Sequence, residues 1–341
     1  SSAMNATAVR FAALILLTAV LAALNVYFGS VDIPARTVTD VLTGSGAQHG
    51  AVEYIILSSR IPQMLTAIIA GAALAASGLL LQTAFRNPLA GPSVLGINSG
   101  ASLGVAVVIL LFGGSVSAGV MSWSGYAAVM AGAFVGSLAV IGVLLALSAV
   151  IRSDLMLLIV GVMIGYLASS LIMLLNYTST ADGIQSYVMW GMGNFSGVTS
   201  SSLPMFALIA GAGIILSLLL VKPLNIVQLG ADYASSLGVN LGRVRNMLLL
   251  ATGLLSSSVT AFCGPIAFIG LAMPHVARMI FRTADHRVLL PATLVVGAAV
   301  ALLCNLICVL PAHMVLPLNA VTPVVGVPVI LYVILRRGRR S

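Results

Sequence analysis

The chain has 341 residues, of which 60% are hydrophobic and only 6% are charged. Water-soluble domains carry about 25% charged residues, so this composition excludes a soluble protein and predicts an all-α integral membrane protein. The net charge of +8 does not indicate a nucleic-acid partner, because the Lys and Arg residues are scattered between apolar runs instead of being gathered on one face.

The first predicted element is the apolar run 11–28. Residues 1–3 precede Met4 and are typical of an expression scar, so we assign a single transmembrane domain to residues 4–341. Arg10 before the run is also a feature of signal peptides, but their apolar region usually has only about 7 to 15 residues. We therefore interpret this run as a membrane span.

The rest of the chain divides into further apolar runs. A bilayer core about 30 Å thick needs roughly 20 apolar residues per helix. Charges, prolines and polar clusters separate ten candidate spans, at 11–28, 61–84, 94–112, 123–149, 155–175, 203–221, 246–262, 265–281, 288–309 and 321–335. The prolines in the eighth and tenth spans are compatible with a kinked or partly re-entrant helix.

The basic residues indicate an orientation, because Lys and Arg accumulate on the cytoplasmic side of a membrane. With ten spans and the amino terminus inside, every Lys and Arg except Arg36 and Arg60 falls on the cytoplasmic face. Removing one span from the middle would move every later loop to the other side and abolish this bias. We therefore expect both termini to be cytoplasmic.

Small residues recur at four-residue spacing inside the spans, which allows helix backbones to approach closely in lipid. They are Gly71 with Ala75, Gly96 with Gly100 and Gly104, Gly132 with Gly136, and Gly161 with Gly165. Glycine is also common in membrane helices in general, so the pattern indicates packing and is silent about a substrate.

The interior of the spans lacks the residues that drive other transport mechanisms. Proton- or sodium-coupled carriers need ionisable groups inside the membrane, and no Asp, Glu, Lys or Arg lies well inside a predicted span. Four dispersed histidines, with His49 and His313 in predicted outer loops, and three cysteines in or beside apolar segments form no metal-ligand spacing. We expect no enzymatic activity, metal or cofactor in this chain, and an energy source outside it.

One inner loop, 222–245, is too long to be a turn. Its apolar residues Leu229, Tyr233 and Leu237 have the spacing of a short amphipathic helix, and Gly238 follows as a helix C-terminal cap would. Two interpretations stay open: a helix that lies at the lipid interface, or a helix that docks into a cytoplasmic partner.

Several motifs in this order resemble one family. They are Arg60-Ile-Pro-Gln63, Phe85-Arg-Asn-Pro-Leu-Ala90, Leu95-Gly-Ile-Asn-Ser-Gly-Ala101, Trp190-Gly-Met-Gly193, Gly264-Pro-Ile-Ala-Phe-Ile-Gly-Leu271, Pro274-His-Val-Ala-Arg278, Asp285-His-Arg287 and Gly326-Val-Pro328. Together they resemble the FecCD family, the permease subunits of ATP-binding-cassette importers for iron chelates, haem and vitamin B12.

The resemblance implies the type II permease architecture, with about ten transmembrane helices, in a bacterial inner membrane. It implies a homodimer with a second permease copy, two cytoplasmic ATPase subunits that hold ATP and Mg, and a periplasmic or lipid-anchored binding protein. The expected cargo is an iron chelate (siderophore or haem) or cobalamin. Which chelate is carried, and whether the second permease is identical, stay open, as do an ion-coupled secondary transporter and a non-transporting scaffold.

The resemblance also assigns the 222–245 loop to ATPase coupling. The residues concerned are Leu229, Gly230, Asp232, Tyr233, Leu237, Gly238, Arg243 and Arg245. Asp232 stands at the family's acidic position, although a solvated helix charge would look the same.

Two further sites follow from the resemblance. Arg60, with Arg36 as a possible substitute, is expected to meet acidic residues of the binding protein, because the guanidinium fork suits carboxylates; a snorkelling arginine is the alternative. The chain departs from the family here, with Gln63, Val309 and Val315 at positions where charged residues are expected.

The gate is expected where the fourth span turns into the fifth. Its residues are Ser153, Asp154, Leu155, Met156 and Met163. Methionines would give an apolar, flexible path suited to a bulky chelate. The alternative is that these methionines fill the core between helices. No residue is expected to bind iron, which would travel inside its carrier molecule.

Overall fold

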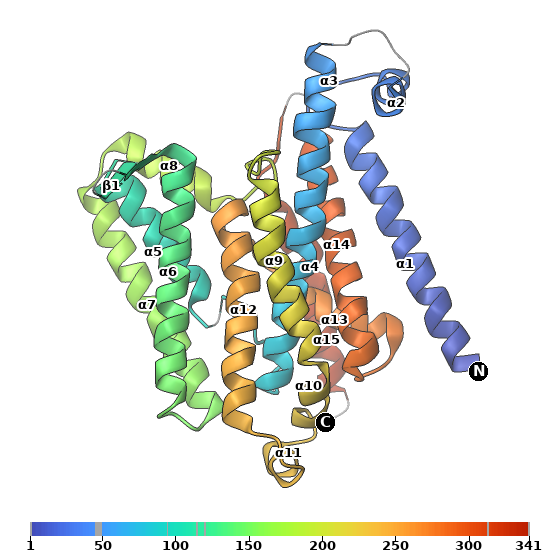
Figure 1. Cartoon of the computed structure of the whole chain (residues 1–341), viewed down its shortest axis with the longest axis vertical. Coiled ribbons are helices and arrows are strands. Elements are labelled where there is room, and N and C mark those ends of the chain that lie inside the picture. Colours follow the sequence, from blue (N-terminus) through green and yellow to red (C-terminus); the bar gives the residue numbers. More distant parts are fainter. Residues whose placement is uncertain are drawn as a thin grey trace.

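The computed structural model describes residues 2–44, 50–93, 95–113, 115–118, 121–311 and 314–339. The predicted outer-loop positions of His49 and His313, and the inner-face position of Arg340, lie outside the described residues. Helices dominate the described chain, which also contains one short β-hairpin (Figure 1).

The elements follow in chain order. They are α1 (Ser2–Tyr27), α2 (Ala35–Thr43), α3 (Ala51–Ile55), the π-helical turn η1 (Ile56–Arg60), α4 (Ile61–Ala84), α5 (Ile97–Ala106), the π-helical turn η2 (Val107–Leu111), β1 (Ser115–Ala118), β2 (Met121–Ser124), α6 (Gly125–Ser148), α7 (Asp154–Thr178), α8 (Ala181–Gly191), α9 (Leu203–Leu219), α10 (Val221–Val227), α11 (Ala231–Ser236), α12 (Leu241–Cys263), α13 (Ile269–Phe281), α14 (His286–Val309) and α15 (Leu318–Gly338).

Each predicted span coincides with a helix, but the helices are not equally long. Within the described residues, seven helices are long and apolar enough to cross a membrane, and the pair α9 and α10, bent by 53°, makes an eighth candidate. The third and eighth predicted spans are the shorter apolar helices Ile97–Leu111 and Ile269–Phe281. The count of ten spans therefore stays a prediction.

Each of the two shorter helices is preceded by an irregular segment instead of a further helical turn. Gly96, at φ 76°, directly precedes α5, and Phe268, at φ 73°, directly precedes α13. Non-helical backbone at membrane depth is tolerated where surrounding protein satisfies its polar groups, and Asn319 does so by donating to the Pro265 carbonyl at 2.6 Å and accepting from the Ala267 N–H at 3.0 Å. The eighth predicted span, 265–281, is therefore helical only from Ile269 onward.

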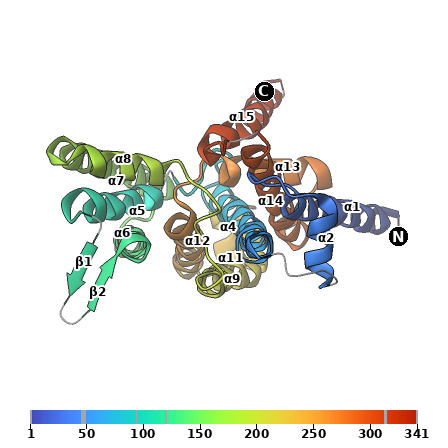
Figure 2. The same cartoon turned by 90° about the horizontal axis from the view of Figure 1, so that it is seen from above.

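Helix α4 is the centre of the bundle. It packs against α9, α12, α13 and α14, and Figure 2 shows it between the lobe of α5 to α8 and the group of α13 to α15. Close backbone approach explains its small residues, because a Cβ on Gly78 would lie 1.6 Å from the Gly270 carbonyl oxygen. Such tight contacts between spans stabilise helix association where apolarity alone gives no driving force.

The repeated glycines of the sequence make the same kind of contact between α5 and α6. A Cβ on Gly104 would lie 1.9 Å from the Gly132 carbonyl oxygen, and one on Gly136 would lie 1.9 Å from that of Gly100. The four-residue spacing therefore marks real helix contacts. By contrast, nothing lies within 4 Å of a Cβ on Gly142 of α6.

A buried amide cluster holds α1 against the bundle. Asn305 of α14 donates to Asn25 of α1 at 2.7 Å and accepts from Gln63 of α4 at 3.1 Å. Asn25 in turn donates to the Leu302 carbonyl at 3.0 Å. In the bilayer such interhelical hydrogen bonds link spans, so Gln63 has a structural partner in α14.

Candidate functional site

Three chain segments meet at the end of the molecule that carries α11, which we call the basic face (Figure 1). They are the α10–α11 segment, the loop from α6 to α7 and the loop from α13 to α14. The described basic residues of these segments and of the adjoining helix ends are Arg86, Arg152, Lys222, Arg243, Arg245, Arg278, Arg282, Arg287, Arg336, Arg337 and Arg339. Arg36 and Arg60 belong to segments at the opposite end.

The predicted amphipathic helix is present but shorter than expected. Gly230, at φ 121°, separates α10 from α11, so Leu229 precedes the helix and Leu237 ends it. The Gly238 N–H donates to the Ser235 carbonyl at 3.1 Å and the Val239 N–H donates to the Ala234 carbonyl at 3.2 Å. With Gly238 at φ 82°, this is the helix end that the sequence indicated.

The apolar side chains of this short helix face away from the chain. Leu229, Tyr233 and Leu237 are 62%, 51% and 55% exposed, and Asp232 in the first turn is exposed beside them. Among the described residues no ion pair holds Asp232. An exposed apolar cluster of this kind is a typical contact surface for a partner or an interface.

Arg245, at the start of α12, binds the predicted gate. Its guanidinium donates to the carbonyls of Ile151 and Arg152, each at 2.7 Å, and more weakly to that of Ser148 at 3.4 Å. It also pairs with the Asp154 carboxylate at 2.6 Å. We call this set the Arg245 junction; it joins a residue assigned to coupling with a residue assigned to the gate.

The neighbouring arginine has no such role. Arg243 is exposed, and its backbone N–H binds the Asn240 side chain, which caps α12 at 3.1 Å. The two predicted coupling arginines are therefore structurally different. Ser148 adds a further link across the junction by donating to Asn246 at 2.9 Å.

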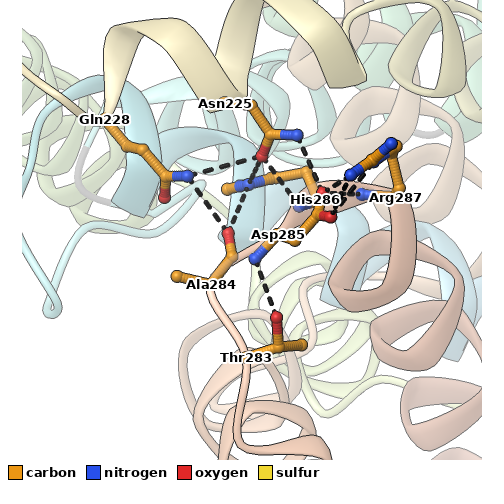
Figure 3. A network of polar contacts seen from close by, with 7 residues as sticks. All are labelled: Asn225, Gln228, Thr283, Ala284, Asp285, His286 and Arg287. Carbon is orange, nitrogen blue, oxygen red and sulfur yellow. Dashed lines mark hydrogen bonds and ion pairs between the residues drawn. The ribbon is translucent and has the colours of Figure 1, made fainter. Parts of the chain in front are cut away.

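A second cluster ties α10 to the start of α14 (Figure 3). The Asn225 oxygen accepts the His286 N–H at 2.8 Å, and its amide nitrogen donates to Asp285 at 2.9 Å. Gln228 donates to the Ala284 carbonyl at 3.2 Å. We call these residues the Asn225 junction. His286 extends it to α4, because its Nε2 lies 2.8 Å from the Thr83 hydroxyl.

Asp285 is held as a carboxylate by its neighbours. The Arg287 side chain, then the Arg287 backbone N–H and then the Asn225 amide, lower the pKa of Asp285 to about 2. Its ion pair with Arg287 measures 2.9 Å. The carboxylate therefore stays charged throughout the physiological range and caps the amino terminus of α14.

The sequence did not single out the members of the Asn225 junction as site residues. Asn225 and Gln228 belong to the loop assigned to coupling, and Asp285 and His286 belong to a motif that was quoted only for the resemblance. The two groups of residues lie about sixty positions apart in the chain. Nothing in the sequence indicates that they are in contact.

The predicted gate residues lie at the start of α7. The Ser153 hydroxyl caps this helix by accepting the Met156 N–H at 3.4 Å. Leu155, Met156 and Met163 are 62%, 53% and 65% exposed. Met156 and Met163 therefore do not fill the core of this chain, and they are available to lipid, a path or a second chain.

The docking arginines differ in their surroundings. Arg60 is 4% exposed and donates to the carbonyls of Val26, Tyr27 and Val31. This geometry gives it a structural role in fixing the connection after α1 and does not support direct contact with another protein. Arg36, on α2, is exposed at the same end of the molecule.

Metal ligation finds no support in the described part of the chain, where no group of three or more His, Cys, Asp or Glu residues could hold an ion. Cys263, Cys304 and Cys308 are buried free thiols. The expectation that this chain binds no metal or cofactor stays a prediction.

Known proteins share both sequence and fold with this chain. The hemin transport system permease protein HmuU of Yersinia pestis is 35% identical over 96% of each chain. The vitamin B12 import system permease protein BtuC of Escherichia coli O127:H6 is 36% identical over 84% of this chain and 85% of its own.

A solved structure, described as an inward-facing conformation of a metal-chelate type ABC transporter, superposes with a TM-score of 0.82 at 28% identity. The match covers 96% of this chain and 99% of the other. This likeness confirms the predicted all-α permease architecture. The model of the FecCD transport family matches residues 15–336, and the chain belongs to that family of membrane permeases.

Proposed function

We propose that this chain is the permease subunit of an ATP-driven importer that carries a metal chelate of siderophore, haem or cobalamin size into the bacterial cell. Two copies form the path, two cytoplasmic ATPase subunits supply the energy, and a periplasmic or lipid-anchored binding protein delivers the cargo. The names of the relatives, which are haem and vitamin B12 permeases, support this cargo class.

The observation that carries the proposal is the exposed cluster of Leu229, Tyr233 and Leu237 on the basic face. The helix before it, α10, is fixed by the Asn225 junction, and the helix after it, α12, is fixed by the Arg245 junction. A partner that moves this short helix would therefore move α7 and α14 with it, which is a rigid-body form of switching. The gathering of Lys and Arg supports a cytoplasmic position for this face and for both termini.

The docking of the binding protein is proposed for the opposite end, around the exposed Arg36. Arg60 contributes by holding the backbone between α1 and α2 in place. The gate is proposed along the exposed side of α7, with Met156 and Met163 facing the path or the second copy.

Uptake into proteoliposomes tests the proposal. The chain is reconstituted with its ATPase and binding protein, and iron siderophore, haem and cobalamin are offered in parallel. We expect one of the three to accumulate in the vesicle lumen only when ATP is supplied in the lumen, the side that corresponds to the cytoplasm. Accumulation without ATP, or no accumulation of any of the three, would contradict the proposal.

Copurification tests the coupling surface separately. Tyr233→Ala removes an exposed ring of α11 and is expected to reduce recovery of the ATPase with the permease. Tyr54→Ala removes an even more exposed ring from α3 at the opposite end and is expected to leave recovery unchanged. Equal recovery with both variants would remove α11 as the contact.

A further inference from the structure

A wide cavity of about 950 Å³ lies on the basic face between the ends of α13 and α15. Four arginines line it: Arg278 and Arg282 at the end of α13, and Arg336 and Arg337 in the last turn of α15. No Asp or Glu is among its lining residues. The cavity shares Ala284 with the Asn225 junction, and none of its lining residues belongs to the Arg245 junction.

The charge of these arginines is not compensated within the described chain. The ion pairs recorded there are those of Arg245 and Arg287, neither of which lines the cavity. Arg278 instead lies 3.3 Å from Nδ1 of His275, whose Nε2 lies 2.7 Å from the Pro88 carbonyl. Because the carbonyl can only accept, His275 donates from Nε2 and offers Arg278 a neutral nitrogen. Four gathered cations therefore call for an anion from outside.

The walls of the cavity are partly apolar. Met279, Tyr332 and Val333 line it together with the arginines. Beside them on α15, Leu331 and Leu335 are 53% and 67% exposed, so the apolar surface of the helix continues from the cavity along the span. A ligand that fits both features carries a negative headgroup and an apolar tail.

We propose that this cavity binds the phosphate of an anionic phospholipid from the leaflet at the basic face. Arginine forks bind phosphate oxygens in pairs, tyrosine is favoured at the level of the headgroups, and basic pockets between spans on the cytoplasmic side suit anionic headgroups. A free phosphate would use the arginines but leave the apolar wall without a partner. This site concerns the membrane around the permease and is independent of the cargo.

Native mass spectrometry of the full chain tests the proposal. Detergent-solubilised protein is doped with phosphatidylglycerol or with phosphatidylcholine of the same acyl chains, and inorganic phosphate is added in a third arm. Each arginine near an anionic headgroup contributes roughly a fivefold gain in affinity, so phosphatidylglycerol is expected to bind at least about tenfold more tightly than phosphatidylcholine.

The double variant Arg336→Gln/Arg337→Gln is expected to abolish most of this preference, and because both residues are exposed at a helix end it should fold. Arg243→Gln/Arg339→Gln removes the same charge from the basic face outside the cavity and is expected to retain the preference. A weaker preference in both variants, or none in the wild type, would overturn the proposal. Displacement of the lipid by inorganic phosphate at millimolar concentration would overturn it in favour of a soluble anion.

The assembled complex provides a last control. The same lipid measurement is made on the permease with its ATPase bound. Retention of phosphatidylglycerol is expected, because α11 and the cavity lie on different helices of the basic face. Loss of the lipid when the ATPase binds would assign the arginines to the protein partner and overturn the lipid site.

Discussion

The Arg245 junction and the Asn225 junction both connect the 222–245 segment to neighbouring spans, but they are built differently. At the first, a single guanidinium reaches three carbonyls and one carboxylate. At the second, the bonds are divided among Asn225, Gln228 and His286. The first junction depends on one side chain and the second on several.

This difference affects how a movement of the 222–245 segment is transmitted to the neighbouring spans. Hydrogen bonds to a charged donor contribute about 1.5 to 3 kcal/mol each, and the Arg245 side chain is only 17% exposed, so water replaces its bonds poorly. The Asn225 junction retains part of its bonds when one member is removed. We therefore expect the connection to α7 to be the more sensitive of the two.

Arg245→Gln is expected to have the largest effect. The shorter amide cannot reach all four acceptors, and the carbonyls of Ile151 and Arg152 lose their donor. Because one lost charged hydrogen bond corresponds to roughly tenfold in an equilibrium, ATP-driven uptake should fall at least about tenfold. Arg339→Gln, at an exposed arginine that follows α15, is the matched control. Equal uptake by both variants would refute the dominance of Arg245.

Asn225→Leu is expected to reduce uptake less, by about fivefold. The substitution leaves the His286 N–H and the Asp285 carboxylate without the amide, but the bonds from Gln228 to Ala284 and between His286 and Thr83 remain. Lys222→Gln changes an exposed residue of the same helix and should transport normally. A loss as large as that of Arg245→Gln would show that the two junctions are equivalent.

Asp154→Asn tests the ion pair alone. The carboxylate is 49% exposed, and exposed ion pairs contribute about 0 to 1 kcal/mol, so uptake should fall less than about fivefold. The three carbonyl bonds of Arg245 stay in place. Asp182→Asn, in the first turn of α8, is the control. A tenfold loss of uptake with Asp154→Asn would show that the ion pair, and not the carbonyl bonds, stabilises the junction.

The smallest effect concerns the pH dependence of the Asn225 junction. The pKa of Asp285 is lowered from 3.8 to about 2, so its stabilising contribution is present above pH 3.8 and is lost as the pH falls toward about 2. Thermal unfolding of wild type and Asp285→Asn should differ by a constant amount between pH 5 and 8, and the difference should shrink as the pH falls from about 4 to about 2. A difference that changes between pH 5 and 8 would contradict this assignment.

The sequence predicted elements better than contacts. The apolar runs predicted the helices, and the four-residue glycine spacing predicted close helix packing, because spacing along a helix fixes which residues share a face; that α5 packs against α6 there was not predicted. The short α2, α8 and hairpin were missed, since they lack the length and hydropathy of a span. The amphipathic pattern from Leu229 to Leu237 was correct in kind, but Gly230 shortened the helix.

Residue roles were harder to predict because they depend on partners distant in the sequence. Nothing near Arg60 in the chain indicates that its guanidinium lies against the carbonyls of Val26 and Tyr27. Likewise, Arg243 and Arg245 look alike in the sequence, and only the turn after α6 distinguishes them. Charged residues at helix ends can therefore be located from the sequence, but their partners require the fold.

A cross-link between α6 and α12 tests most directly whether the Arg245 junction moves as one body. Ser148 and Asn246 are joined by a 2.9 Å hydrogen bond, so Ser148→Cys/Asn246→Cys can be linked by a short thiol reagent, while the three native cysteines are buried. If the junction is rigid, the cross-linked permease retains ATP-driven uptake. Continued ATP hydrolysis without uptake after cross-linking would show that the two helices must separate and would contradict the account.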